Sequence, residues 1–103
     1  MRAGFFQWTT PDLRVELDKA GVLENVSELK ATVTQGAVQL VYRLADVTLE
    51  EDALVIHFSQ EDTGRLKHGK ARLQVNVKYS DGKRDATSEG TLYIFDNDSK
   101  EAM

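Results

Sequence analysis

The sequence predicts an all-β protein built as an antiparallel sandwich of two sheets with about seven strands. Apolar residues recur at every second position in several short stretches, which is the period of a half-buried strand. Glycine-containing turns such as Gln35-Gly36 and Asp81-Gly82 separate some of these stretches. From Leu54 to Phe95 no apolar stretch has a helical period.

The first half of the chain supplies four of the expected strands. One covers the alternating residues from Leu13 to Leu17, and two more flank Gln35-Gly36 and predict a hairpin. A short fourth strand is expected at Val47 to Leu49, before the charged turn Glu50-Glu51-Asp52. The stretch from Leu23 to Glu28 fits either a turn or one helical turn. The inward residues of the hairpin are Leu29, Ala31, Val33, Val38, Leu40 and Tyr42.

The second half supplies three more strands. Residues 53–59 are apolar on both faces, which is typical of a strand inside a sheet. Residues 60–69 are expected to form a turn-rich loop with room for one 3₁₀ turn. The stretch 71–79 alternates most regularly, and Asp81-Gly82 predicts a hairpin back along residues 84–95. Gly90 is a candidate β-bulge in that return strand.

The domain organisation follows from length and pattern. The 103 residues suit one domain, which we expect to comprise an aromatic arm at 1–10, a sandwich at 11–96 and a polar tail at 97–103. The expected arrangement is Ig-like, but there is no cysteine and therefore no Ig disulfide. Short apolar runs near Phe5 and Phe6 are too brief for a signal peptide or a membrane helix, so we expect a soluble protein without a signal peptide.

Charge and motif content favour a protein that is not an enzyme. The net charge is −4, and the longest basic cluster, residues 65–72, is short enough to be a solvated turn, so no nucleic acid is expected. His57 and His68 have no partner at metal-ligand spacing, and no acidic cluster fits a calcium loop. No serine lies in a nucleophile elbow, and no phosphate loop is present. We expect no catalytic residues, metal or cofactor.

Phe5, Phe6 and Trp8 form the one cluster that suggests a binding surface. Aromatic side chains are enriched among the residues that anchor interfaces. The same cluster could instead fold back over one end of the sandwich. Both interpretations remain open from the sequence.

Several stretches of the chain resemble a known class of proteins. The opening TTPDLRVELD, the segment LKATVTQGAVQLVYR and residues 55–94 follow an order similar to that of small Ig-like proteins of bacteriophages and prophages of Gram-positive bacteria. The resemblance spans roughly residues 9–96, and is sharpest at the turn 59–63 and the Asp81-Gly82 hairpin. The residues Phe5-Phe6-Gln7-Trp8 depart from that pattern.

The resemblance implies a structural or accessory protein of a virion, tail or baseplate. Such a protein would act through contacts with other phage structural proteins or as a homo-oligomer, in the virion or in the host cytoplasm during assembly. One alternative is a carbohydrate- or ligand-binding sandwich with Trp8, Tyr42, Tyr79 or Tyr93 as a stacking platform. Another is a small hydrolase that depends on His57 or His68.

Overall fold

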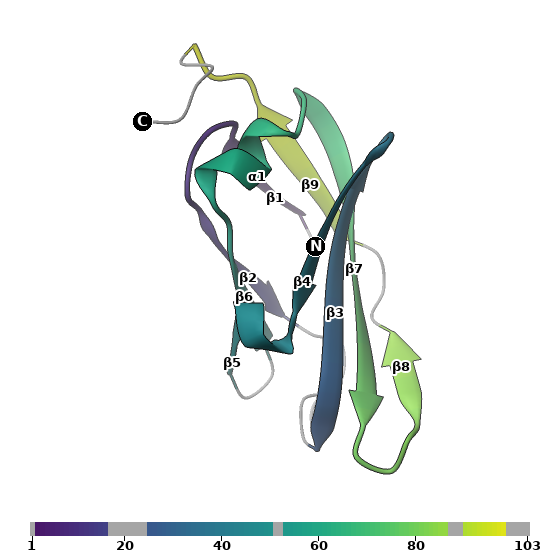
Figure 1. Cartoon of the computed structure of the whole chain (residues 1–103). Coiled ribbons are helices and arrows are strands. Elements are labelled where there is room, and N and C mark those ends of the chain that lie inside the picture. The colour runs from purple at the N-terminus through teal and green to yellow at the C-terminus, as the bar shows by residue number, and fades with distance from the viewer. Residues whose placement is uncertain (1, 17–24, 51–52, 87–89, 99–103) are drawn as a thin grey trace.

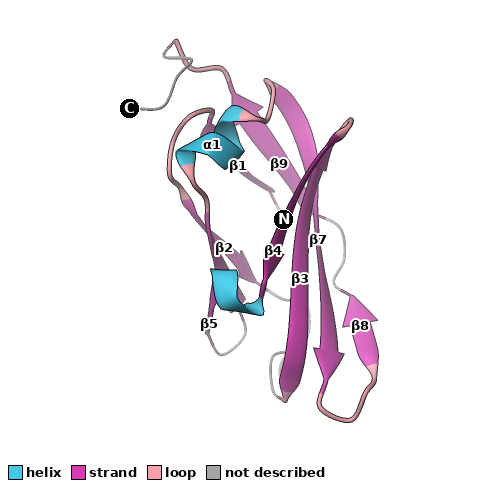
Figure 2. Ribbon diagram, viewed as in Figure 1, coloured by secondary structure: helices cyan, strands magenta, loops and turns pink. Residues whose placement is uncertain are grey.

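The computed structural model describes residues 2–16, 25–50, 53–86 and 90–98, with side chains described from residue 4 onward. Two β-sheets in these residues pack face to face (Figure 1), and helical structure is confined to two short segments (Figure 2). The strands are β1 Arg2–Phe6, β2 Asp12–Glu16, β3 Val26–Gln35, β4 Val38–Arg43, β5 Val47–Leu49, β6 Ala53–His57, β7 Gly69–Tyr79, β8 Arg84–Ala86 and β9 Gly90–Phe95. The helical segments are η1 Leu44–Asp46 and α1 Gln60–Gly64.

The predicted all-β, two-sheet sandwich is confirmed, with two corrections. The described residues hold nine strands rather than about seven, because the N-terminal segment forms β1 and the predicted return strand is divided into β8 and β9. The larger sheet has the order β1-β9-β7-β3-β4 with β8 also paired to β7, and the smaller has the order β2-β6-β5. Every pairing is antiparallel except that of β1 with β9, which is parallel.

Alternating apolar residues form the core, as the sequence pattern predicts. Along β7, Ala71, Leu73, Val75 and Val77 are buried while the residues between them face outward. The smaller sheet contributes residues such as Leu54 and Ile56, both fully buried, from the opposite side. Burying each side chain of this size stabilises the fold by about 1.5–3 kcal/mol before entropic costs. The strand β6 lies in the middle of its sheet, which confirms the prediction of an interior strand.

Both predicted hairpin turns are present. Gly36 has φ of +57° between β3 and β4, and Gly82 has φ of +89° between β7 and β8, a region that glycine enters without steric cost. The pairing of β8 and that of β9 with β7 differ by one residue of register, since Asn76 faces Ala86 whereas Leu73 faces Gly90. Gly90, the candidate β-bulge, pairs with Leu73 in the same register as the rest of β9. Residues 87–89, Leu17 and residues 99–103 lie outside the described residues.

The segment expected as an arm at residues 1–10 is integrated into the sandwich. The strand β1 forms one edge of the larger sheet, and Gln7 continues the ladder by donating its backbone N–H to Phe95 at 3.0 Å. The predicted loop at 60–69 begins with α1, an α-helical turn rather than a 3₁₀ turn. Its N-cap, Ser59, accepts a hydrogen bond from the Asp62 backbone at 3.2 Å.

Candidate docking surface

Three large aromatic or apolar side chains are exposed together at the β1 edge of the larger sheet. The alternation of β9 turns Leu92 and Ile94 into the core and therefore turns Tyr93 and Phe95 outward. The parallel neighbour β1 aligns Phe6 with Phe95. Phe6, Tyr93 and Phe95 remain 54%, 38% and 41% exposed, respectively.

These rings contact one another in a line. The ring centroids of Phe6 and Phe95 are 5.4 Å apart, and those of Phe95 and Tyr93 are 5.1 Å apart. His68, in the loop before β7, extends the line with an edge-on contact to Tyr93 at 5.7 Å. Separations of this size are those of favourable aromatic pairs. We refer to Phe6, Phe95, Tyr93 and His68 as the aromatic row.

Gly4 allows the row to lie close to the backbone of β1. A Cβ atom at Gly4 would be 2.7 Å from the carbonyl oxygen of Tyr93 and 2.9 Å from the ring of Phe95. Any side chain there would therefore displace Phe95. The strand β1 has no strand on its other side in the described part of the sheet. An edge of this kind is available to pair with another chain.

The three aromatic residues singled out in the sequence have different surroundings. Phe5 belongs to the core, 7% exposed, with its ring 5.0 Å from that of Phe58. Trp8 is half-buried and lies against Gly64 of α1. Of the three, Phe6 alone joins the aromatic row, so the structure divides a cluster that the sequence presents as one.

The segment that carries Trp8 is fixed to α1 by hydrogen bonds. The hydroxyl of Thr63 donates to the Thr9 carbonyl at 2.8 Å and accepts from the Thr9 backbone N–H at 3.0 Å. The Gln7 side chain donates to the Leu66 carbonyl at 2.6 Å. Thr63 is fully buried, and these bonds satisfy its hydroxyl. Trp8 is therefore part of the joint between the two sheets.

The smaller sheet carries a second polar arrangement on its outer face. His57 Nδ1 lies 2.8 Å from Asp12 Oδ1 on β2, and His57 Nε2 lies 2.8 Å from Thr48 Oγ1 on β5. Hydroxyl, imidazole and carboxylate are thus connected in the order of a hydrolytic triad. The side chains of His57 and Asp12 are 48% and 67% exposed on an open sheet face. The arrangement joins all three strands of the smaller sheet.

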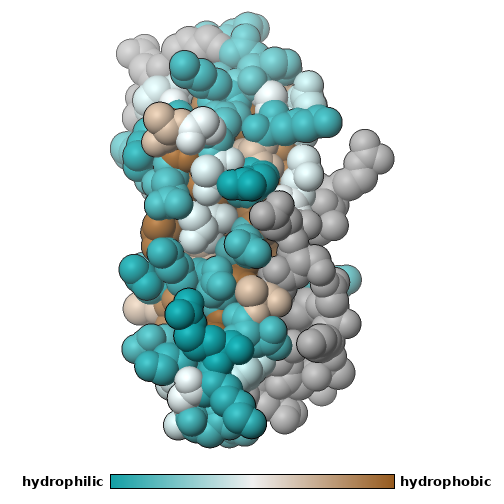
Figure 3. Space-filling model, turned by 90° about the vertical axis from the view of Figure 1, so that its right-hand side faces the viewer, coloured by the Kyte–Doolittle hydropathy of each residue, from teal (hydrophilic) through white to brown (hydrophobic). Residues whose placement is uncertain are grey.

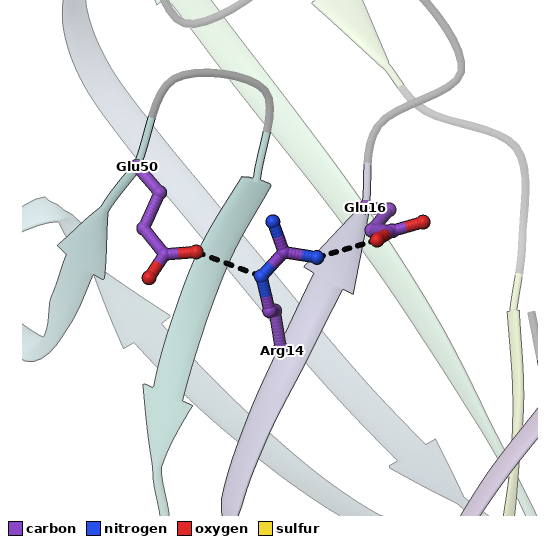
Figure 4. Close-up of polar contacts among 3 residues, drawn as sticks. All are labelled: Arg14, Glu16 and Glu50. Atoms are coloured by element: carbon purple, nitrogen blue, oxygen red, sulfur yellow. Dashed lines mark hydrogen bonds and ion pairs between the residues drawn. The ribbon is translucent and has the colours of Figure 1, made fainter.

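Arg14 lies beside this arrangement and is paired on both sides (Figure 4). It donates from Nε to Glu50 at 2.7 Å and from Nη1 to Glu16 at 2.5 Å. The hydrogen bond to Glu50, followed by that to Glu16, raises the pKa of Arg14 above its already high ordinary value. On this face the cation is neutralised by its own neighbours.

Tyr42 lies at the border of core and solvent, where it lines a hollow together with His57. Its ring packs edge-on against Phe58 at 5.1 Å, and its hydroxyl donates to Asp62 Oδ2 at 2.8 Å. Burial, and then the hydrogen bond to the Asp62 carboxylate, raise the pKa of Tyr42 far above its ordinary value. The raised pKa keeps the Tyr42 hydroxyl protonated at neutral pH, as its hydrogen bond to Asp62 requires.

Sequence reasoning missed Phe95 and did not connect Tyr93 with Phe6. The alternation Leu92-Tyr93-Ile94-Phe95 contains the necessary information, because it places Tyr93 and Phe95 on one face. The parallel pairing with β1 is a long-range feature that the alternation does not reveal.

No family model, curated protein or solved structure matches the chain. Within the described ranges, no helix has the length and apolarity to cross a membrane.

Proposed function

We propose that this protein is a non-enzymatic assembly module that binds a protein partner through the aromatic row and the β1 edge. The observation that carries the proposal is the contact series from Phe6 through Phe95 to Tyr93, three exposed rings on neighbouring strands. Aromatic side chains anchor many interfaces because they bury a large area with few rotatable bonds. The adjacent strand edge offers backbone hydrogen bonds to the same partner.

The proposed setting is a bacteriophage or prophage particle. The resemblance of residues 9–96 to small phage proteins supports this setting, and the two-sheet architecture is compatible with an Ig-like module of a tail or baseplate. In this proposal the partner is a second copy of the chain or another structural protein of the particle. The protein would then function in the virion, or in the host cytoplasm during assembly. It would need neither a cofactor nor a nucleic acid for this role.

Self-association is the first property to measure. We expect light scattering on a sizing column to give the wild-type protein a mass above the 11.5 kDa of one chain. The F6S/F95S variant, which removes two rings of the aromatic row but leaves the core intact, should elute as a monomer. V41S is the matched control, since Val41 is an exposed apolar residue on β4, far from the row in the sheet order.

A second arm of the experiment covers a partner of another kind. If wild-type protein is a monomer, the tagged protein should retain structural proteins from a lysate of phage-producing cells, and F6S/F95S should lose them while V41S keeps them. A monomeric wild-type protein that retains no phage structural protein would contradict the proposal. Deleting residues 1–10 would be a poorer test, because it removes Phe5 from the core.

The alternative of a carbohydrate- or ligand-binding module now depends on one of its four aromatic candidates. Tyr42 is buried, Trp8 packs on Gly64 and Tyr79 is half-buried, whereas Tyr93 is exposed in the aromatic row. A ring of this kind can stack on a sugar. A glycan screen in which wild-type protein binds and Y93S does not would favour this alternative over protein assembly.

A further inference from the structure

The outer face of the larger sheet is polar over most of its area. Figure 3 shows the side of the molecule where β3, β7 and β8 lie, and its surface is mostly hydrophilic. The outward positions of β7 alternate with its buried ones and include Asn76 and Lys78. Their cross-strand neighbours on β3 are Lys30 and Glu28.

Four basic side chains gather around one shallow hollow on this face. Lys30 on β3 lies opposite Arg43 on β4, and Lys78 on β7 lies opposite Arg84 on β8. All four line a hollow of about 290 Å³ together with Asn76 and Glu28. We call these residues the basic hollow. They come from four strands, and the widest gap between them in sequence exceeds thirty residues.

The four cations form no ion pair within 4 Å in the described part of the chain. Glu28 is the one acidic residue in the lining. Arg14 on the opposite sheet differs in this respect, because it holds two carboxylates. Four cations grouped around a single carboxylate repel one another, and an anionic ligand would relieve that repulsion.

The net charge of the hollow is also opposite in sign to that of the rest of the protein. It holds four of the 13 basic residues and one of the 17 acidic residues, so its net charge is +3 in a chain of net charge −4. An anionic partner would be repelled by most of the molecule and attracted here. Such an asymmetry orients a partner during approach as well as holding it.

We propose that the basic hollow binds an acidic segment of a protein partner, with Asp or Glu at alternate positions of an extended chain. Alternate residues on one face of a strand are about 7 Å apart. The row of Lys30 and Arg43 and the row of Lys78 and Arg84 are separated by the same two-residue step along β7, from Asn76 to Lys78. One carboxylate therefore fits each row, and Asn76, which lies in the row of Lys30 and Arg43, can hydrogen-bond the backbone of the bound segment.

The lining favours carboxylates over a nucleic acid. Single-stranded nucleic acids are held by stacking of bases on aromatic rings as well as by phosphate contacts. The residues that line the hollow include no aromatic ring on which a base could stack. This proposal is independent of the aromatic row, because the two surfaces share no residue. Either proposal could be refuted while the other still holds.

The test uses two labelled probes at the same salt concentration, a decaglutamate peptide and a ten-residue oligothymidylate. Fluorescence anisotropy should show that decaglutamate binds the full chain more tightly at 50 mM than at 300 mM NaCl. The K30Q/K78Q variant should bind it at least tenfold more weakly. The matched control K67Q/K83Q also removes two positive charges, but from turns outside the hollow. Its dissociation constant for decaglutamate should stay within twofold of that of the wild type.

Four outcomes would overturn the proposal. The first is that decaglutamate does not bind at 50 mM NaCl. The second and third are that both double variants lose affinity for decaglutamate equally, or that K30Q/K78Q loses none. The fourth is that the oligothymidylate binds more tightly than decaglutamate. The last would identify the hollow as a nucleic-acid site instead. The F6S/F95S variant should bind decaglutamate as the wild type does, because the aromatic row lies outside the hollow. This test therefore does not depend on whether the aromatic row binds a partner.

Discussion

The indole ring of Trp8 lies so close to Gly64 that a Cβ on that glycine would come within 2.5 Å of two ring carbons. Trp8 itself has φ of +59°, an uncommon backbone conformation for a residue with a side chain. The hydrogen bonds between Thr9 and Thr63 hold the same two segments together. The packing that connects the two sheets thus requires a glycine at position 64 of α1.

We predict that Gly64→Ala destabilises the protein although alanine is the better helix former. The gain in helix propensity is about 1 kcal/mol, whereas overpacking a filled site typically costs about 1–3 kcal/mol, and a 2.5 Å approach lies at the severe end. Urea denaturation followed by circular dichroism should show a lower midpoint for the variant.

The background variant W8A supplies the control. With the indole removed, Gly64→Ala should become neutral or stabilising, so the two changes should be strongly non-additive. The same destabilisation in both backgrounds would show that the Trp8 contact is not the cause.

A second prediction concerns the hydroxyl of Tyr42. Tyr42→Phe removes the hydrogen bond to the Asp62 carboxylate and should lower the free energy of unfolding by about 1–3 kcal/mol at pH 7. The pKa of Tyr42 is raised on folding, so its contribution is complete below the unfolded pKa of about 10 and falls as the pH rises above it. The stability difference between wild type and Y42F should therefore shrink above pH 10. Tyr79→Phe, at a half-buried tyrosine, is the control, and a difference that grows with pH would contradict the prediction.

A third prediction tests whether the Thr48, His57 and Asp12 line is structural. The three side chains lie on an open sheet face, whereas enzymes hold their substrates in clefts that exclude water. Thr48→Val and His57→Gln should therefore leave the hydrolysis of p-nitrophenyl acetate at the wild-type rate. Wild-type hydrolysis that exceeds that of both variants by a hundredfold would establish a hydrolase and refute the assembly proposal.

The sequence pattern predicted local structure well and long-range pairing poorly. The alternation along residues 71–79 and the glycines at 36 and 82 are local, and the strand and the turns that they predict are present. The parallel pairing of β1 with β9 joins the two ends of the chain. Strand periodicity determines which residues share a face but leaves the neighbouring strand undetermined.

The same limit explains what could be predicted of the candidate surfaces. Phe6 could be selected as an aromatic residue near the N-terminus, but its neighbours Tyr93 and Phe95 are brought to it by the parallel pairing. The cations of the basic hollow are spread over four strands, and the pairing of those strands brings them together. The run at residues 65–72, the longest basic cluster in the sequence, contributes His68 to the aromatic row and no residue to the hollow.

The pairing of β1 with β9 also has a consequence for synthesis on the ribosome. In the described part of the sheet, β1 has no partner other than β9, so it stays unpaired until β9 has been translated. Phe6 and Phe95 meet only at that moment. A chain terminated before β9 would lack Tyr93 and Phe95, half of the aromatic row, so the surface proposed for assembly forms only in chains that include β9.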